Sequence, residues 1–227
     1  MRKNNASLFR LIKKSSKDQL VKLAGSKERC SHGHTIFEHP NCFDLNRGER
    51  VGVIDIETDH LKADFGTTLC YVIKELDKPN YYTRVITQAE TMKVNDKRVV
   101  EGCIEDMRRF DRLIGYYHTG FDIPFLRARA SINELEFPPY GSIYVDDLYY
   151  IIRKNFGLSS KGLENACRQL LGISNKTKLD GKIWKSASRG DDVSMGYILD
   201  HCMKDVEDTE KLYHHIKDFY KPVRKSL

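Results

Sequence analysis

The chain has 227 residues, with 38 Lys and Arg against 32 Asp and Glu, which gives a formal net charge of +6. Hydrophobic residues make up 40% and charged residues 31% of the sequence, as in an ordinary globular protein, and the length suits one α/β domain with a small appendage. No apolar run approaches the ~18 residues of a membrane-spanning helix, and no segment resembles a signal peptide. We therefore expect a cytoplasmic protein without a membrane partner.

Positive charge is concentrated in the first 29 residues. They contain nine Lys and Arg against Asp18 and Glu28, a net charge of +7, which leaves −1 for the rest of the chain. We expect a basic helical arm over residues 1–29 that contacts a polyanion such as nucleic acid, because each neutralised phosphate releases counterions. An amphipathic helix with a solvated lysine face remains the alternative.

Residues 30–49 form a second segment, which is rich in cysteine and histidine. Five of the chain's fourteen Cys and His residues lie within thirteen positions: Cys30, His32, His34, His39 and Cys42. Thiolate and imidazole ligands at such short spacings suit tetrahedral zinc, for which four of these five residues suffice. A polar loop, or a disulfide between the two cysteines, remains the alternative.

From residue 50 onward the pattern alternates between strands and helices. Strands are expected at 51–56, 68–74, 81–87, 112–117 and 142–145, and helices at 101–110, 123–132, 146–155, 160–171 and 195–220. A three-strand meander followed by parallel strands that are linked through helices predicts a ribonuclease H-like mixed sheet in an α/β domain. This domain is expected to span residues 50–220 and to be followed by a basic tail at 221–227.

The first strand ends in two carboxylates, Asp55 and Glu57. Side chains alternate faces along a strand, so both should point the same way, less than ~7 Å apart. Asp-x-Glu occurs twice more in the chain, but in a predicted helix, where residues two apart do not share a face. Two like charges at the end of a buried strand are costly to desolvate, which indicates a divalent cation between them.

Two further acids complete a candidate site. Asp122 directly follows the predicted fourth strand and opens a helix, where α/β folds bind ligands; it is also a favourable helix N-cap. Asp205 lies on the last helix, at the edge of its apolar stripe, and His201 precedes it by four residues on the same face. An acidic helix flank is by itself more often only solvated.

In order and spacing these residues resemble the three exonuclease motifs of the DEDD superfamily. This is the DnaQ-like group, which includes the proofreading domains of DNA polymerases. The segment 121–126, Phe-Asp-Ile-Pro-Phe-Leu, is particularly similar to the second motif of family-B polymerase exonucleases, and the resemblance covers about residues 51–217. One subclass has a tyrosine four residues before the last aspartate and the other a histidine five before it. This chain has His201 four residues before Asp205, a histidine in the tyrosine register.

The resemblance implies a metal-dependent 3′–5′ exonuclease that acts on single-stranded ends of DNA or RNA. The four carboxylates would hold two Mg²⁺ or Mn²⁺ ions, and His201 would accept the proton of the attacking water. Thr58 and Phe121 would contact the terminal nucleotide, and a polymerase or another replication or repair protein is a candidate partner. Two alternatives stay open: an inactive zinc-containing nucleic-acid-binding module on the same fold, and a structure-specific endonuclease.

Overall fold

The computed structural model describes residues 25, 29, 35, 49–173, 180–220 and 227. The chain divides into two compact units, Met1–Glu49 and Arg50–Leu227. The basic arm and the Cys/His segment lie almost wholly outside the described residues, so what the sequence predicts for them stays a prediction. The second unit carries the fold that follows.

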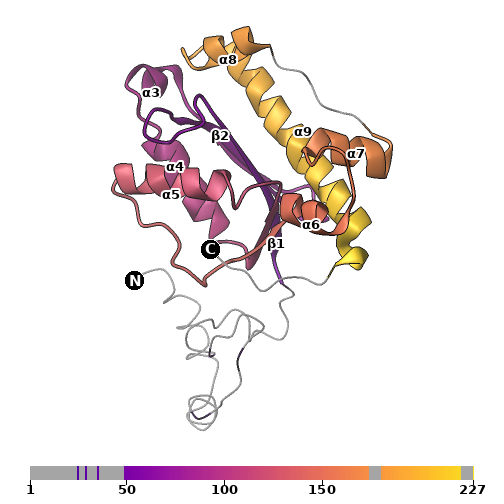
Figure 1. The fold of residues 1–227 in the computed structure, drawn as a ribbon. Coiled ribbons are helices and arrows are strands. Elements are labelled where there is room, and N and C mark those ends of the chain that lie inside the picture. The colour runs from indigo at the N-terminus through magenta and orange to yellow at the C-terminus, as the bar shows by residue number, and fades with distance from the viewer. Residues whose placement is uncertain (1–24, 26–28, 30–34, 36–48, 174–179, 221–226) are drawn as a thin grey trace. The chain divides into compact units, whose positions relative to one another are not determined.

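A five-stranded mixed sheet forms the centre of this unit (Figure 1). Its strands are β1 (Val51–Thr58), β2 (Thr68–Glu75), β3 (Tyr81–Val85), β4 (Arg112–Gly115) and β5 (Tyr144–Asp147), in the order β3-β2-β1-β4-β5. The pairs β1–β2 and β2–β3 are antiparallel, whereas β1–β4 and β4–β5 are parallel. The structure thus has the meander and the parallel strands that the sequence predicts.

The central position of β1 follows from its sequence. Val53, Ile54 and Ile56 are almost fully buried, as in a strand that is covered on both faces. Gly52 is required by close packing, because a Cβ there would lie 2.9 Å from a side-chain methyl of Ile73 and 3.0 Å from the Phe110 ring. β1 is therefore held rigidly up to the residues that carry its carboxylates.

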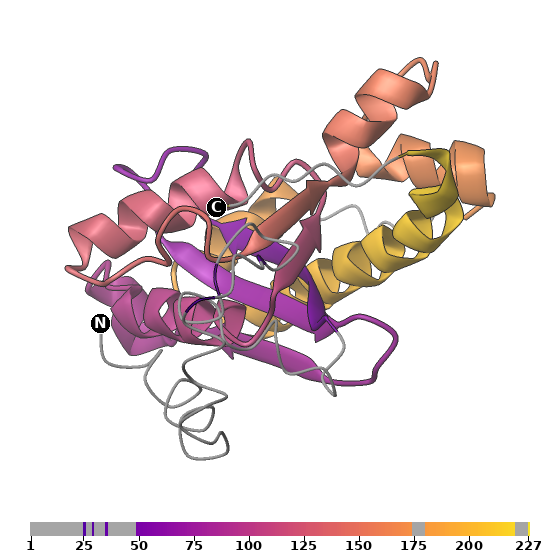
Figure 2. The same cartoon turned by 90° about the horizontal axis from the view of Figure 1, so that it is seen from below.

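Helices cover both faces of the sheet, as Figures 1 and 2 show. They are α3 (Gln88–Met92), α4 (Lys97–Met107), α5 (Asp122–Ile132), α6 (Leu148–Asn155), α7 (Leu163–Leu171), α8 (Gly181–Ala187) and α9 (Asp192–Ile216), with a 3₁₀ turn at Lys217–Phe219. The long helix α9 packs on β1, β2 and β4, while α4 packs on β2 and β3 and contacts α5. Within the described ranges, no helix has the length and apolarity that crossing a membrane requires.

Several element boundaries differ from those expected. The third strand ends at Val85 rather than at residue 87, because Thr87 caps the unexpected helix α3 in a capping box with Glu90. The last helix begins at Asp192 rather than at 195, because the side chain of Asp191 accepts a hydrogen bond from the Ser194 amide. The fifth strand lies two residues later than expected, and α8 was not expected at all.

A buried carboxylate ties the sheet to its helices. Asp96, which is fully buried, accepts hydrogen bonds from the Thr68 amide at 2.8 Å and the Asn133 side-chain amide at 2.9 Å. It also accepts two from Arg129, at 2.7 and 2.9 Å, which makes a bidentate ion pair. Asp96, which directly precedes α4, thereby links the start of β2 to α5.

Replacement of Asp96 by alanine should strongly destabilise the fold. Removing one partner of a buried ion pair costs about 3–5 kcal/mol, because the remaining charge, here that of Arg129, is left without compensation. Urea unfolding followed by circular dichroism measures the loss. The exposed pair Lys204–Asp200, at 2.7 Å, provides the control, and Lys204→Ala should cost less than about 1 kcal/mol. Similar losses in the two variants would contradict this role of Asp96.

Candidate active site

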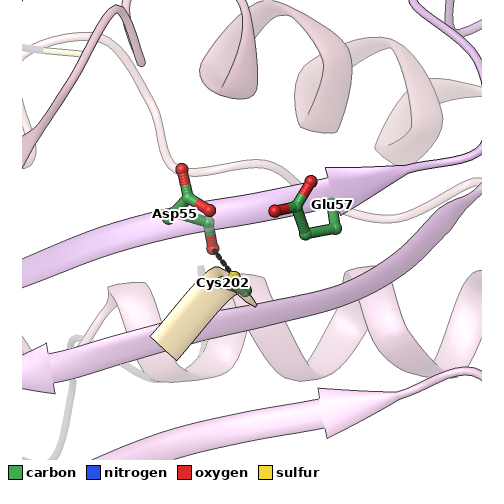
Figure 3. Close-up of side chains that lie close together, drawn as sticks. All are labelled: Asp55, Glu57 and Cys202. Carbon is green, nitrogen blue, oxygen red and sulfur yellow. Dashed lines mark hydrogen bonds between the residues drawn. The ribbon is translucent and has the colours of Figure 1, made fainter. Parts of the chain in front are cut away.

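Strand β1 presents two carboxylates side by side. Asp55 and Glu57 project from the same face of the strand, and Cys202 of α9 lies next to the backbone of Asp55 (Figure 3). One ligand atom from each of these three residues lies within 4.8 Å of the others. The Cys202 thiol donates a hydrogen bond to the Asp55 carbonyl oxygen at 3.4 Å, which fixes α9 against the strand. The alternation predicted from the sequence therefore places the pair as expected.

Asp122 joins this pair from α5. Its Oδ1 accepts a hydrogen bond from the amide of Ile56, the residue between the two β1 acids, at 3.1 Å. The side chain is buried, with 4% exposure. The interpretation of Asp122 as the helix N-cap is wrong, because Phe121 occupies the cap position and Asp122 is the first helical residue. The carboxylate reaches across to the strand instead of capping its own helix.

Helix α9 supplies the last two groups. His201 Nε2 lies 3.9 Å from Glu57 Oε1 and 3.8 Å from Asp205 Oδ2, so the imidazole stands between two carboxylates. The His201 side chain is 9% exposed, that of Glu57 14% and that of Asp205 21%, so these groups keep part of their surface open. The spacing of four residues brings His201 and Asp205 onto one face of the helix, as predicted.

The electrostatics show that the four acids act on one another. Burial raises the pKa of Asp55 well above its ordinary value, and the charges of Glu57, Asp122 and Asp205 raise it further. Burial also raises the pKa of Asp122 to about 7, against the opposing effect of the hydrogen bonds that it accepts from backbone amides. A half-buried patch of mutually repelling carboxylate oxygens has the donor set that a hard divalent cation requires.

The two expected substrate contacts border this patch. A β-bulge interrupts the pairing of β1 with β2 between Glu57 and Thr58, and the Thr58 hydroxyl donates to the carbonyl of His60 at 2.9 Å. Phe121, directly before Asp122, is half-buried, and its ring centroid lies 5.6 Å from that of Phe125. Bulges commonly redirect side chains next to active sites, which is consistent with the expectation for Thr58. Contact of either residue with substrate stays a proposal.

Asp147 is the supporting residue that the sequence did not indicate. It ends β5, and its carboxylate accepts hydrogen bonds from the amides of Tyr117 and Thr119, both at 2.9 Å, and from the Thr119 hydroxyl at 2.6 Å. It also accepts one from the Tyr149 amide at 3.1 Å, which caps α6. One carboxylate therefore holds the turn that leads into Asp122. The sequence signal that indicated Asp122, an acid at the end of a strand, also applies to Asp147. It was missed because the fifth strand was expected to end at residue 145.

His118 lies inside the same turn. Its ring is fully buried, and Nδ1 lies 3.6 Å from Asp147 Oδ2. Burial lowers the His118 pKa to about 4, against the opposing effect of Asp147. The imidazole is therefore neutral at ordinary pH, and it serves as packing for the turn rather than as a proton donor at the site.

The sequence and the structure offer two other groups of candidate metal ligands. The five Cys and His residues at 30–42 that were expected to bind zinc lie outside the described residues. Asp77, Glu210 and His214 offer ligand atoms within 4.8 Å of one another. However, Lys74 Nζ lies 2.5 Å from a Glu210 oxygen, and His214 Nε2 lies 2.8 Å from Asp77 Oδ1. In this second group the Glu210 carboxylate is therefore already paired with a lysine.

Comparison with known proteins supports the same fold. A model of the RNase H superfamily matches residues 53–217. No curated protein sequence matches the chain. Among solved structures, the family B DNA polymerase from the hyperthermophilic archaeon Pyrobaculum calidifontis is similar, with a TM-score of 0.62 and 18% identity over 75% of this chain. The match covers 25% of the polymerase chain, so the likeness concerns one part of that enzyme. The expected ribonuclease H-like fold is confirmed.

The raised pKa values predict that magnesium stabilises this protein more at alkaline than at acidic pH. Since the folded-state pKa of Asp122 is raised to about 7, its contribution to stability is fully present below its ordinary pKa and is lost as the pH rises through about 7. The bound cation offsets this loss where the acids are ionised. Thermal unfolding should therefore show a larger Mg²⁺-induced rise in Tm at pH 8 than at pH 5.

The control for this prediction is Asp122→Asn, which removes the titrating group but retains an oxygen acceptor for the Ile56 amide. Its Tm without metal should depend less on pH between 5 and 8 than that of the wild type. Equal effects of Mg²⁺ on the wild-type Tm at pH 5 and pH 8 would contradict the raised pKa of Asp122 or the binding of Mg²⁺ beside it.

Proposed function

The chain belongs to the RNase H superfamily, and on this basis we propose that it is a metal-dependent 3′–5′ exonuclease. Its substrate is a single-stranded end of DNA or RNA, whose phosphodiester bonds it hydrolyses one nucleotide at a time. The observation that carries the proposal is the assembly of Asp55, Glu57, Asp122 and Asp205, from three different elements, around one patch that also holds a histidine.

The four carboxylates are the proposed ligands of two Mg²⁺ or Mn²⁺ ions. Their oxygens form the hard donor set that these ions prefer. The raised pKa values of Asp55 and Asp122 support the proposal, because a bound cation would offset the cost of ionising these buried acids. When bound, such ions activate water for attack and neutralise charge on the phosphate oxygens. The chain itself contributes the rigid placement of the acids, through the buried strand β1 and the Ile56–Asp122 hydrogen bond.

His201 is the proposed general base. Its Nε2 lies between Glu57 Oε1, at 3.9 Å, and Asp205 Oδ2, at 3.8 Å, and thus beside two of the proposed metal ligands. A neutral imidazole there can accept a proton from water as it attacks the phosphorus. The two flanking carboxylates then stabilise the imidazolium that forms.

Thr58 and Phe121 are the proposed contacts to the terminal nucleotide, because they lie next to the acids along the chain.

The basic arm at 1–29 is proposed to add non-specific affinity for the nucleic-acid strand. The Cys/His segment is proposed to bind one structural zinc ion, which elemental analysis of the purified protein tests. A polymerase is the proposed partner type, since the similar structure belongs to a family B DNA polymerase.

An end-labelled oligonucleotide tests the proposed activity. With Mg²⁺, a 5′-labelled single strand of DNA or RNA should give a ladder that shortens from the 3′ end, and a chelator should stop the reaction. Alanine at Asp55, Glu57, Asp122 or Asp205 should each remove most activity, and double replacements should cost little more, because the metal ions act as a unit. Glu207→Gln on α9, which can keep the hydrogen bond with the Tyr81 hydroxyl, should leave the rate unchanged. A single internal product would indicate an endonuclease instead.

His201→Ala should lower the turnover number by roughly 10²-fold or more while substrate and metal still bind, as expected when a general base is removed. His201→Tyr should recover part of this loss, because tyrosine occupies this register in the related subclass. The exposed His215 of the same helix provides the control, and His215→Ala should have no effect. Single-turnover cleavage measures the rate, and a wild-type rate for His201→Ala would exclude this residue as the base.

A further inference from the structure

Three tyrosines gather at the ends of β4 and β5, beside the candidate active site. Tyr117 follows β4, and Tyr149 and Tyr150 lie in the first turn of α6. The ring centroids are 4.8 Å apart for Tyr117 and Tyr149, 5.2 Å for Tyr149 and Tyr150, and 6.0 Å for Tyr117 and Tyr150. Tyr117 and Tyr150 are 43% and 39% exposed, so two rings of this tyrosine cluster are open to solvent.

The backbone of Tyr117 adopts an unfavourable conformation in the turn that follows β4. Tyr117 has φ of 61°, a left-handed conformation that is unfavourable for a bulky side chain. The hydrogen bond from its amide to Asp147 at 2.9 Å holds it there. Gly120 leaves room for the ring, because a Cβ at that position would lie 2.5 Å from Tyr117 Cε2. Asparagine or glycine would fit this backbone with less strain, so the fold keeps the aromatic ring against the local preference.

The tyrosine cluster is connected directly to the catalytic turn. The Tyr117 carbonyl accepts hydrogen bonds from the amides of Gly120 at 2.9 Å and Phe121 at 3.0 Å, and Phe121 immediately precedes Asp122. Asp147 binds the amides of both Tyr117 and Tyr149, which fixes the two halves of the cluster to each other. The tyrosine cluster is thus linked through the backbone of this turn to the residue that precedes Asp122.

The surroundings of the cluster fit a polyanion that carries aromatic bases. Arg153 and Lys154 are exposed in the last turn of α6, three and four residues after Tyr150, and thus on the same side of the helix. Among the described residues, the rings of the cluster meet at 66°, 42° and 86°, so none is covered by a parallel partner. Exposed aromatic faces beside cations are the elements with which proteins bind single-stranded nucleic acid.

We propose that Tyr117, Tyr149 and Tyr150 form a subsite that stacks on a nucleobase of the single-stranded substrate, upstream of the nucleotide that is removed. This inference rests on the proposed exonuclease function and extends it. Tyr117 and Tyr150 provide the exposed rings, and the half-buried Tyr149 packs against both. Arg153 and Lys154 neutralise the backbone phosphates beside the stacked base. Because every base has an aromatic face, the subsite accepts any sequence but requires an unpaired strand.

Oligonucleotides that carry 2-aminopurine at successive positions from the 3′ end test the subsite. Calcium replaces magnesium, so that the strand is bound but not consumed. The wild-type protein should quench the fluorescence strongly at one internal position. The double variant Tyr117→Asn with Tyr150→Ala should leave the probe at that position fluorescent and bind the strand roughly 10-fold or more weakly. Tyr117→Phe combined with Tyr150→Phe should keep the quenching, because stacking needs the ring and not the hydroxyl.

Tyr140, which is 88% exposed, provides the matched control, and Tyr140→Ala should bind and quench as the wild type does. An abasic nucleotide at the quenched position should weaken binding to the wild type as much as the double replacement does, and the two losses should not add. Thermal unfolding confirms that the variants are folded, which is expected because asparagine tolerates the φ at position 117.

The outcomes separate the subsite from the proposed function. Two results would overturn the subsite alone, provided that the wild type cleaves in Mg²⁺. One is that 2-aminopurine stays unquenched at every position, and the other is that the double variant binds with unchanged affinity. A wild-type protein that neither cleaves nor binds any strand would overturn the exonuclease proposal and the subsite with it. Quenching at one position that depends on the two rings would establish the subsite.

Discussion

The mutual repulsion of four carboxylates is the constraint on which the rest of this structure depends. Asp55, Glu57, Asp122 and Asp205 come from a strand and two helices, and burial and neighbouring charge together raise the pKa of Asp55. The fold opposes this repulsion with contacts that involve no acid side chain of the patch, such as the buried strand β1 and the Cys202 thiol on the Asp55 carbonyl. Asp122 is held by the Ile56 amide. The acids are thus held close together by the fold itself, which would preorganise the site for the proposed cations.

The part of the site that the sequence predicts is the part set by local periodicity. Alternation along a strand places Asp55 and Glu57 on one face, and the helical repeat places His201 beside Asp205. Local periodicity does not predict the partner of the Asp122 side chain. Local preference makes an aspartate at this position an N-cap, but the Ile56 amide, 66 residues away in sequence, attracts the carboxylate instead. A tertiary hydrogen bond of this kind leaves no periodic signal in the chain.

The fold was predictable in its order of elements and less so in their ends. Strands β1 and β2 follow from runs of eight residues rich in apolar side chains, whereas α3 and α8 are helices of only five and seven residues. The capping box of Thr87 and Glu90 stabilises α3, and such short-range side-chain contacts outweigh a weak strand pattern. The shift of β5 by two residues mattered most, because it concealed that Asp147 ends a strand next to β4.

Asp147 shows how the parallel part of the sheet serves the site. The carboxyl ends of adjacent parallel strands meet at one edge, where α/β folds bind ligands. At this edge the β4 turn carries Tyr117 and leads to Asp122, while β5 leads to Tyr149 and Tyr150. Because Asp147 accepts hydrogen bonds from both segments, a movement of one displaces the other. The turn before Asp122 and the tyrosine cluster therefore share the Asp147 carboxylate as a support. Under the proposed function, a base on the cluster and a phosphate at the acids would thereby be oriented relative to each other.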